Sequence, residues 1–128
     1  MRLQGTSFVS LDGAFPSLGA VCGDLYIYSN SQLTTFGTAF ANLRMVMGTL
    51  TFSYHRTAAF TSLAGAFPQL TNITGNLYIQ YNDYLSTVNG AFPRLKWVTG
   101  LIYPCVLSSS LPSFLLCARA CGVVCVCV

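Results

Sequence analysis

Acidic side chains are nearly absent from this chain. Its 128 residues include no glutamate, and the only acids are Asp12, Asp24 and Asp83. A pair of carboxylates for general acid and base catalysis is therefore hard to assemble. His55 is the only histidine and Lys96 the only lysine, which narrows acid–base chemistry further. The composition predicts a protein that is not an enzyme and that uses no cofactor.

Positive charge is also sparse. The six basic residues give a net charge of +3 and form no run. A nucleic-acid partner is not expected, because such partners require a concentrated basic surface. Attachment to a membrane through a polybasic segment is equally unsupported.

The N-terminal stretch lacks the apolar segment of about 7–15 residues that a secretory signal peptide needs. Either the protein is intracellular, or its true N-terminus lies upstream of this sequence. We favour the second interpretation, because the first residues already follow the register of an internal repeat.

The repeat is the strongest signal in the chain. The phrases GAFPSL, TAFANL, GAFPQL and GAFPRL place phenylalanine at 15, 40, 67 and 92, with spacings of 25, 27 and 25 residues. A fixed period in this range is typical of solenoid proteins. We assign the solenoid to residues 1–103, with copies at about 8–30, 33–55, 60–82 and 85–103.

Two kinds of segment alternate within each copy. Apolar residues at every second position, as in Val21, Gly23, Leu25 and Ile27, predict strands at about 21–28, 46–53 and 73–80. The Gly-Ala-Phe-Pro phrase limits the preceding stretch to a tight return with at most about one helical turn. Such coils stack in register, so we expect a mainly β fold, a parallel β-solenoid with coils of about 25 residues and a parallel sheet along one side.

Glycine and asparagine recur at fixed places in the coil. We expect the glycines at 23, 48, 75 and 100 to lie within the strands and to leave room for the phenylalanine of the return segment. Asn30 and Asn82 follow the strands, and His55 takes this position in the second copy. The sequence thus predicts that His55 forms hydrogen bonds at a coil corner rather than acting in catalysis or metal binding.

The strings V-C-G-D-L-Y-I-Y-S-N (21–30) and I-T-G-N-L-Y-I-Q-Y-N (73–82) resemble the receptor L domain, the leucine-rich ligand-binding domain of insulin and epidermal growth factor receptors. The resemblance covers about residues 7–103 and implies a right-handed β-helix on a cell-surface protein, although the repeat itself allows either hand. The regular Gly-Ala-Phe-Pro phrase is closer to leucine-rich-repeat surface proteins of protists or bacteria. The family has no catalytic residues.

The last part of the chain differs from the repeat. Pro104 stands where Ile27, Phe52 and Ile79 stand, so we expect the fourth copy to fail just after Gly100. Residues 104–128 are an apolar, cysteine-rich tail that we expect to be disordered or a weak membrane or anchor segment. Cys117, Cys121, Cys125 and Cys127 lack the paired spacing of a zinc site, so no metal is predicted.

One outward column of the strands suggests a place for a ligand. It holds Tyr26, Thr51, Tyr78 and Tyr103, and Tyr28, Ser53 and Gln80 lie in the next column. Tyrosine is enriched in protein interfaces, but it also suits half-buried sheet positions, where it stabilises its cross-strand neighbours. The candidate ligand-binding residues are Tyr26, Tyr28, Thr51, Tyr78, Gln80 and Tyr103.

The function most consistent with these features is a non-catalytic recognition or adhesion module of a cell-surface or secreted protein, with a protein or glycan ligand. The sequon Asn72-Ile73-Thr74 makes Asn72 a candidate glycosylation site. Two alternatives stay open: a cytoplasmic scaffold of the same fold, and an incomplete gene product without independent activity.

Overall fold

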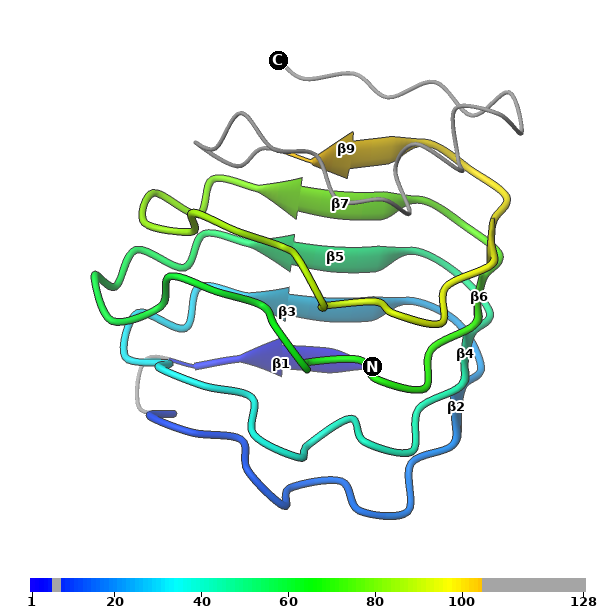
Figure 1. Ribbon diagram of the computed structural model, residues 1–128, viewed down its shortest axis with the longest axis horizontal. Coiled ribbons are helices and arrows are strands. Elements are labelled where there is room, and N and C mark those ends of the chain that lie inside the picture. Colours follow the sequence, from blue (N-terminus) through cyan, green and yellow to red (C-terminus); the bar gives the residue numbers. More distant parts are fainter. Residues whose placement is uncertain (6–7, 105–128) are drawn as a thin grey trace.

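The strands of this protein form two parallel sheets that share one core. The structure is a computed structural model, and it describes residues 1–5 and 8–104. One sheet has the order β1-β3-β5-β7-β9 and the other the order β2-β4-β6-β8 (Figure 1). The strands of the first sheet are β1 (Arg2–Gln4), β3 (Leu25–Tyr28), β5 (Leu50–Ser53), β7 (Leu77–Gln80) and β9 (Ile102–Pro104). Those of the second are β2 (Ala20–Val21), β4 (Met45–Val46), β6 (Asn72–Ile73) and β8 (Trp97–Val98).

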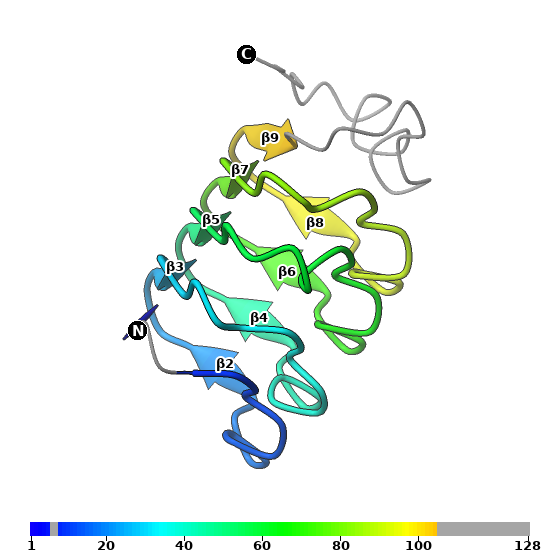
Figure 2. The same cartoon turned by 90° about the vertical axis from the view of Figure 1, so that its left-hand side faces the viewer.

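Each coil of the chain lies directly on the one before it, as Figure 2 shows. Leu25 pairs with Leu50 and Leu50 with Leu77, so residues one repeat apart are neighbours in space. The predicted parallel β-solenoid with coils of about 25 residues is confirmed. No helix occurs in the part of the chain that the structure describes, and the return segments consist of turns and isolated bridges.

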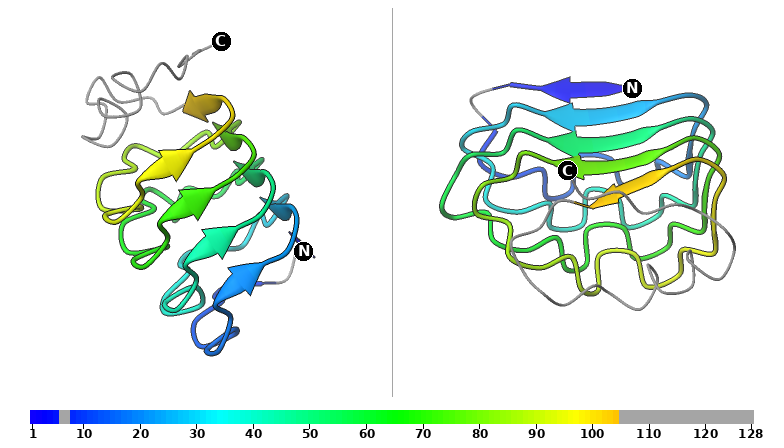
Figure 3. Two further views of the ribbon diagram at one scale, coloured as in Figure 1. Left: turned by 90° about the vertical axis from the view of Figure 1, so that its right-hand side faces the viewer. Right: turned by 90° about the horizontal axis from the view of Figure 1, so that it is seen from above.

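The expected single strand of each coil is in fact two strands separated by a corner. β2 ends at Val21 and β3 begins at Leu25, with Gly23 between them, and the corner recurs in the next coils. The expected parallel sheet along one side is present, but the corner splits each predicted strand and so divides each coil between two sheets (Figure 3).

Three of the corner glycines, Gly48, Gly75 and Gly100, are required by the close approach of the preceding coil, whereas Gly23 has open space beside it and a φ of 137°. A Cβ atom on Gly75 would lie 2.6 Å from the carbonyl carbon of Gly48. The hypothesis that these glycines make room for a phenylalanine was wrong, because the backbone of the preceding coil fills that space. Side chains on the corner add hydrogen bonds between coils: Asp24 Oδ1 accepts from the Thr49 N–H at 2.7 Å, and Asn76 Oδ1 accepts from the Leu101 N–H at 2.7 Å.

Phenylalanine rings form the centre of the core. The repeat phenylalanines stack in one column, with centroid distances of 5.6 Å between Phe15 and Phe40 and 5.1 Å between both Phe40 and Phe67 and Phe67 and Phe92. Phe36 packs edge-on against Phe40 and two further rings. This stacking follows from the repeat, because the same residue type occurs at the same position of each coil and therefore packs on its equivalent in the next coil.

Both ends of the described solenoid extend beyond the expected repeat. β1 pairs with β3, with Leu3 opposite Ile27, so a strand precedes the first complete copy. At the other end Pro104 pairs with Ile79 within β9. The fourth copy thus does not fail just after Gly100, because its strand continues in register through Pro104. The predicted tail from residue 105 onward, including its cysteines, lies outside the described residues.

Candidate binding face

The outward side of the five-stranded sheet carries two columns of side chains, which we call the tyrosine face. The strand register places Arg2, Tyr26, Thr51, Tyr78 and Tyr103 in the first column. The second contains Gln4, Tyr28, Ser53 and Gln80. All six candidate ligand-binding residues therefore share one surface. Arg2 and Gln4 were missed, although the alternation Arg-Leu-Gln matches Tyr-Ile-Tyr at 26–28 and could have revealed them.

Polar neighbours fix the tyrosine rings in place. The Tyr26 hydroxyl donates to Asp24 Oδ2 at 3.0 Å, and Asn76 Nδ2 donates to the Tyr78 hydroxyl at 2.9 Å. The Tyr28 hydroxyl donates to Gln4 Oε1 at 2.6 Å. Because these bonds restrain side chains at the surface, the face is largely formed before any ligand binds.

Asp24 and Tyr26 form a charge-assisted pair. The Thr49 N–H and the Tyr26 hydroxyl lower the pKa of Asp24 below its ordinary value. The same hydrogen bond, with some burial and the nearby carboxylate charge, raises the pKa of Tyr26. Asp24 is thus a carboxylate and Tyr26 a protonated phenol at neutral pH, so the phenol O–H is engaged as a donor.

The rings differ in how much of their surface is free. Tyr78 and Tyr103 stack on each other with centroids 4.8 Å apart and an angle of 18°. Tyr26 has Thr51 opposite it in the next strand and therefore no ring neighbour there. The Arg2 guanidinium carbon lies 4.8 Å from the centroid of the Tyr28 ring, which is a cation–π contact.

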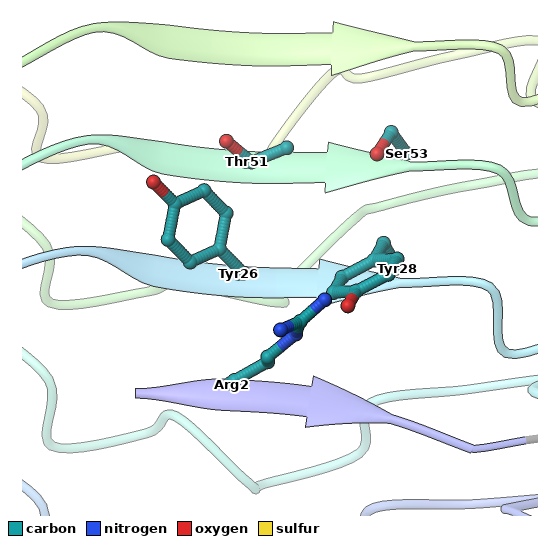
Figure 4. A pocket seen from close by; sticks show the side chains of 5 residues that line it. All are labelled: Arg2, Tyr26, Tyr28, Thr51 and Ser53. Atoms are coloured by element: carbon teal, nitrogen blue, oxygen red, sulfur yellow. The ribbon is translucent and has the colours of Figure 1, made fainter.

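An open groove runs between the rings on β3. It has a volume of about 370 Å³ and is lined by Arg2, Tyr26, Tyr28, Thr51 and Ser53 (Figure 4). The small side chains of Thr51 and Ser53 leave this space, since a larger residue on β5 would fill it. Ser53 is itself buried, with 6% of its surface exposed, so the groove reaches close to the sheet backbone.

A second pair of tyrosines lies at the end of the face. Tyr54 and Tyr81 follow β5 and β7, and their rings stack at 4.7 Å. Both have left-handed backbone, with φ of 60° and 54°, as does Ser29 in the first copy with φ of 55°. Glycine or asparagine adopts this conformation more readily than tyrosine. No feature of the sequence pattern indicated this backbone strain.

The residues after the left-handed position turn into the core, as predicted for His55. Asn30, His55 and Asn82 are all buried. Each reaches a carbonyl of the preceding coil: Asn30 Nδ2 to Leu3 at 3.3 Å, His55 Nε2 to Ile27 at 3.1 Å and Asn82 Nδ2 to Phe52 at 3.2 Å. His55 is thus a coil-corner hydrogen bonder.

The second nitrogen of His55 faces another carbonyl. Nδ1 lies 3.4 Å from the Asn30 carbonyl oxygen, and the ring stacks on Phe52 at 4.0 Å. A neutral imidazole has one N–H and satisfies only one of the two carbonyls. Burial is the larger influence and lowers the pKa of His55, against the two carbonyls that raise it.

The candidate glycosylation site lies in the other sheet, apart from the tyrosine face. Asn72 is a half-buried residue of β6, between Met45 and Trp97 in the neighbouring strands.

Cys22 is an exposed free thiol. Within residues 1–5 and 8–104, no group of three or more histidine, cysteine, aspartate or glutamate side chains is placed to hold a metal ion. The same residues contain no helix long and apolar enough to cross a membrane.

Comparison with known proteins identifies no relative. No protein-family model, curated protein or solved structure matches this chain. The chain is a parallel β-solenoid of about four turns.

Proposed function

We propose that this solenoid is a non-catalytic recognition module of a cell-surface or secreted protein, similar in kind to the receptor L domain, and that it binds a protein segment on the tyrosine face. The observation that carries the proposal is the groove on β3, where Tyr26 and Tyr28 flank an open space with Arg2 at one end. Rings restrained by hydrogen bonds present a large contact area that loses little entropy on binding.

The left-handed tyrosines support the same face. Tyr54 and Tyr81 adopt a backbone conformation that smaller residues adopt at less cost, yet both rings lie exposed at the end of the second column. Strain of this kind is often found where function requires a particular side chain.

The geometry favours a protein ligand over a glycan on this face. A sugar stacks on the flat side of an aromatic ring, whereas Tyr78 and Tyr103 already cover one another, as do Tyr54 and Tyr81. Arg2 lies over one side of Tyr28. Each of these five rings therefore has one side occupied, and its edge and hydroxyl group suit the mixed polar and apolar surface of a peptide.

Selection from a displayed peptide library tests this proposal. Peptides enriched on the wild-type domain should bind the Tyr26→Ser/Tyr28→Ser variant about tenfold or more weakly, as expected for loss of aromatic anchors. Tyr84 is an exposed tyrosine outside both columns, so Tyr84→Ser is the matched control and should bind normally. Peptides that bind both variants equally would contradict the proposal. So would a double variant with a lowered melting temperature and unchanged affinity per folded molecule, since the tyrosines would then act only in stability.

Glycosylation of Asn72 is part of the proposal and has its own test. Secretion of the domain from eukaryotic cells behind an added leader should yield a glycan on Asn72, removed by Asn72→Gln. A secreted domain without that glycan would contradict the assignment of Asn72, whose side chain is only half exposed.

A further inference from the structure

Three of the six basic residues lie just before two strands of the second sheet, Arg44 before β4 and Arg94 and Lys96 before β8. Arg44, Arg94 and Lys96 are far apart in the sequence and all exposed. The Thr71 N–H donates to the Arg44 carbonyl and the Lys96 N–H to the Thr71 carbonyl, both at 2.9 Å. Arg44 and Lys96 therefore stand two coil spacings apart, about 10 Å. We call Arg44, Arg94, Lys96 and Trp97 the basic patch.

No carboxylate side chain neutralises the basic patch. The carboxylate of Asp12 accepts a hydrogen bond from Thr38, and that of Asp24 accepts hydrogen bonds from Thr49 and Tyr26. Asp83 forms an ion pair with Arg56. These three are all the acidic side chains in the chain. The Arg56–Asp83 pair is the only ion pair among the described residues, and it lies at a different turn.

An exposed tryptophan completes the basic patch. Trp97 lies next to Lys96 at the start of β8, and 63% of its surface is exposed. Beside it is a depression of about 430 Å³ lined by Thr71, Pro93, Arg94, Leu95 and Lys96. The left view in Figure 3 shows the sheet to which β8 belongs, with its parallel strands one above another along the solenoid.

We propose that the basic patch binds an anionic polysaccharide, with the sugar ring on Trp97 and its sulfate or carboxylate groups on Arg44, Arg94 and Lys96. A linear polyanion fits this arrangement, because Arg44 lies two coils away from Arg94 and Lys96 along the solenoid. Arg94 is already oriented, because its guanidinium donates to Gln69 Oε1 at 2.9 Å. An indole presents a broad flat ring for a sugar and an N–H for a polar group.

Two other polyanions fit less well. An anionic membrane is normally recognised by clusters of about 4–8 basic residues, more than the patch contains. Single-stranded nucleic acid needs successive aromatic platforms for successive bases. The neighbours of Trp97 in its column are Asn72 and then Met45, which provide none.

Binding of a heparin hexasaccharide, measured by titration calorimetry at several salt concentrations, tests the proposal. In the wild-type domain, the logarithm of the binding constant should fall with the logarithm of the salt concentration with a slope of about −2 to −3, as expected for three cations. The variant Arg44→Gln/Arg94→Gln/Lys96→Gln should bind about a hundredfold more weakly. Trp97→Ser should lose about fivefold with an unchanged salt slope.

The controls separate a site from general positive charge. Arg56→Gln removes one charge outside the patch and should bind the hexasaccharide normally, whereas Lys96→Gln alone should weaken it. Tyr26→Ser/Tyr28→Ser should also bind normally, so failure of the tyrosine-face proposal leaves this one intact. Equal losses in Arg56→Gln and Lys96→Gln, or no binding at about 0.15 M salt, would overturn the proposal. Tighter binding of oligothymidylate or of phosphatidylserine vesicles would do the same.

Discussion

His55 is the residue whose chemistry depends most on its surroundings. It is buried between Phe52 and Phe60, and its partners are backbone carbonyls and Asn82. Burial lowers the pKa of His55 in the folded protein. Below the unfolded pKa of about 6.5, the unfolded chain takes up a proton that the folded chain resists, so stability should fall as the pH falls from about 7 to 5.

The variant His55→Asn tests this pH dependence. Asparagine already occupies the equivalent corner at Asn30 and Asn82, so the variant should fold. Its melting temperature should vary less between pH 7 and pH 5 than that of the wild type, because no other side chain titrates mainly in this range. Thermal melts at several pH values measure the difference. Parallel pH profiles for the two proteins would contradict the prediction.

Phe67 lies at the centre of the ring column and is fully buried between Phe40 and Phe92. Phe67→Ala should lower the free energy of unfolding by about 3–5 kcal/mol, and Leu77→Ala by about 2–5 kcal/mol, through lost burial and the cavity left behind. Phe8 is 43% exposed and provides the control, since Phe8→Ala should change stability by much less. Urea unfolding gives the three values. Similar losses at Phe8 and Phe67 would show that the column is not the core.

At the scale of the element, the corner between two strands is the part that sequence patterning predicted least well. Alternation of apolar residues runs through Gly23 without a break, because Val21, Gly23 and Leu25 keep the period of two. The corner arises from contact with the coil before, which a periodicity within one coil does not record. The outward columns were predicted correctly, because both strand faces depend only on the alternation.

Gly75→Ala tests the corner. The added Cβ would meet the backbone of Gly48, so the substitution should destabilise the protein by about 1–3 kcal/mol. Gly19 lies before β2 with open space where its Cβ would be. Gly19→Ala should therefore be neutral or stabilise by up to about 1 kcal/mol, through the reduced freedom of the unfolded chain. Chemical denaturation of both variants gives their free energies of unfolding. Equal stability of Gly75→Ala and Gly19→Ala would contradict the close approach of Gly75 to the backbone of Gly48.

The whole molecule is a stack in which each coil contacts its neighbours, so coils should be removable as units. Excision of residues 46–72 joins Met45 to Ile73, which occupies the same column as Val46. The shortened chain should fold with a β-type circular dichroism spectrum and a lower melting temperature. Excision of residues 46–59 instead joins Met45 to Phe60, which breaks the register, and should give an unfolded or aggregated protein. Equal behaviour of the two deletions would contradict a modular solenoid.

The period, the parallel stacking, the inward columns and the shared face of the six candidate residues could all be predicted from the sequence, because they follow from similar residues that recur at the same position of each repeat. Three features became visible only in the folded chain: the corner at glycine, the left-handed tyrosines, and the position of Arg44 two coils from Lys96. These features depend on how closely successive coils approach and on which side of the corner each residue falls. The contacts involved are between residues about one or two repeats apart, so the residue pattern of a single coil does not predict them.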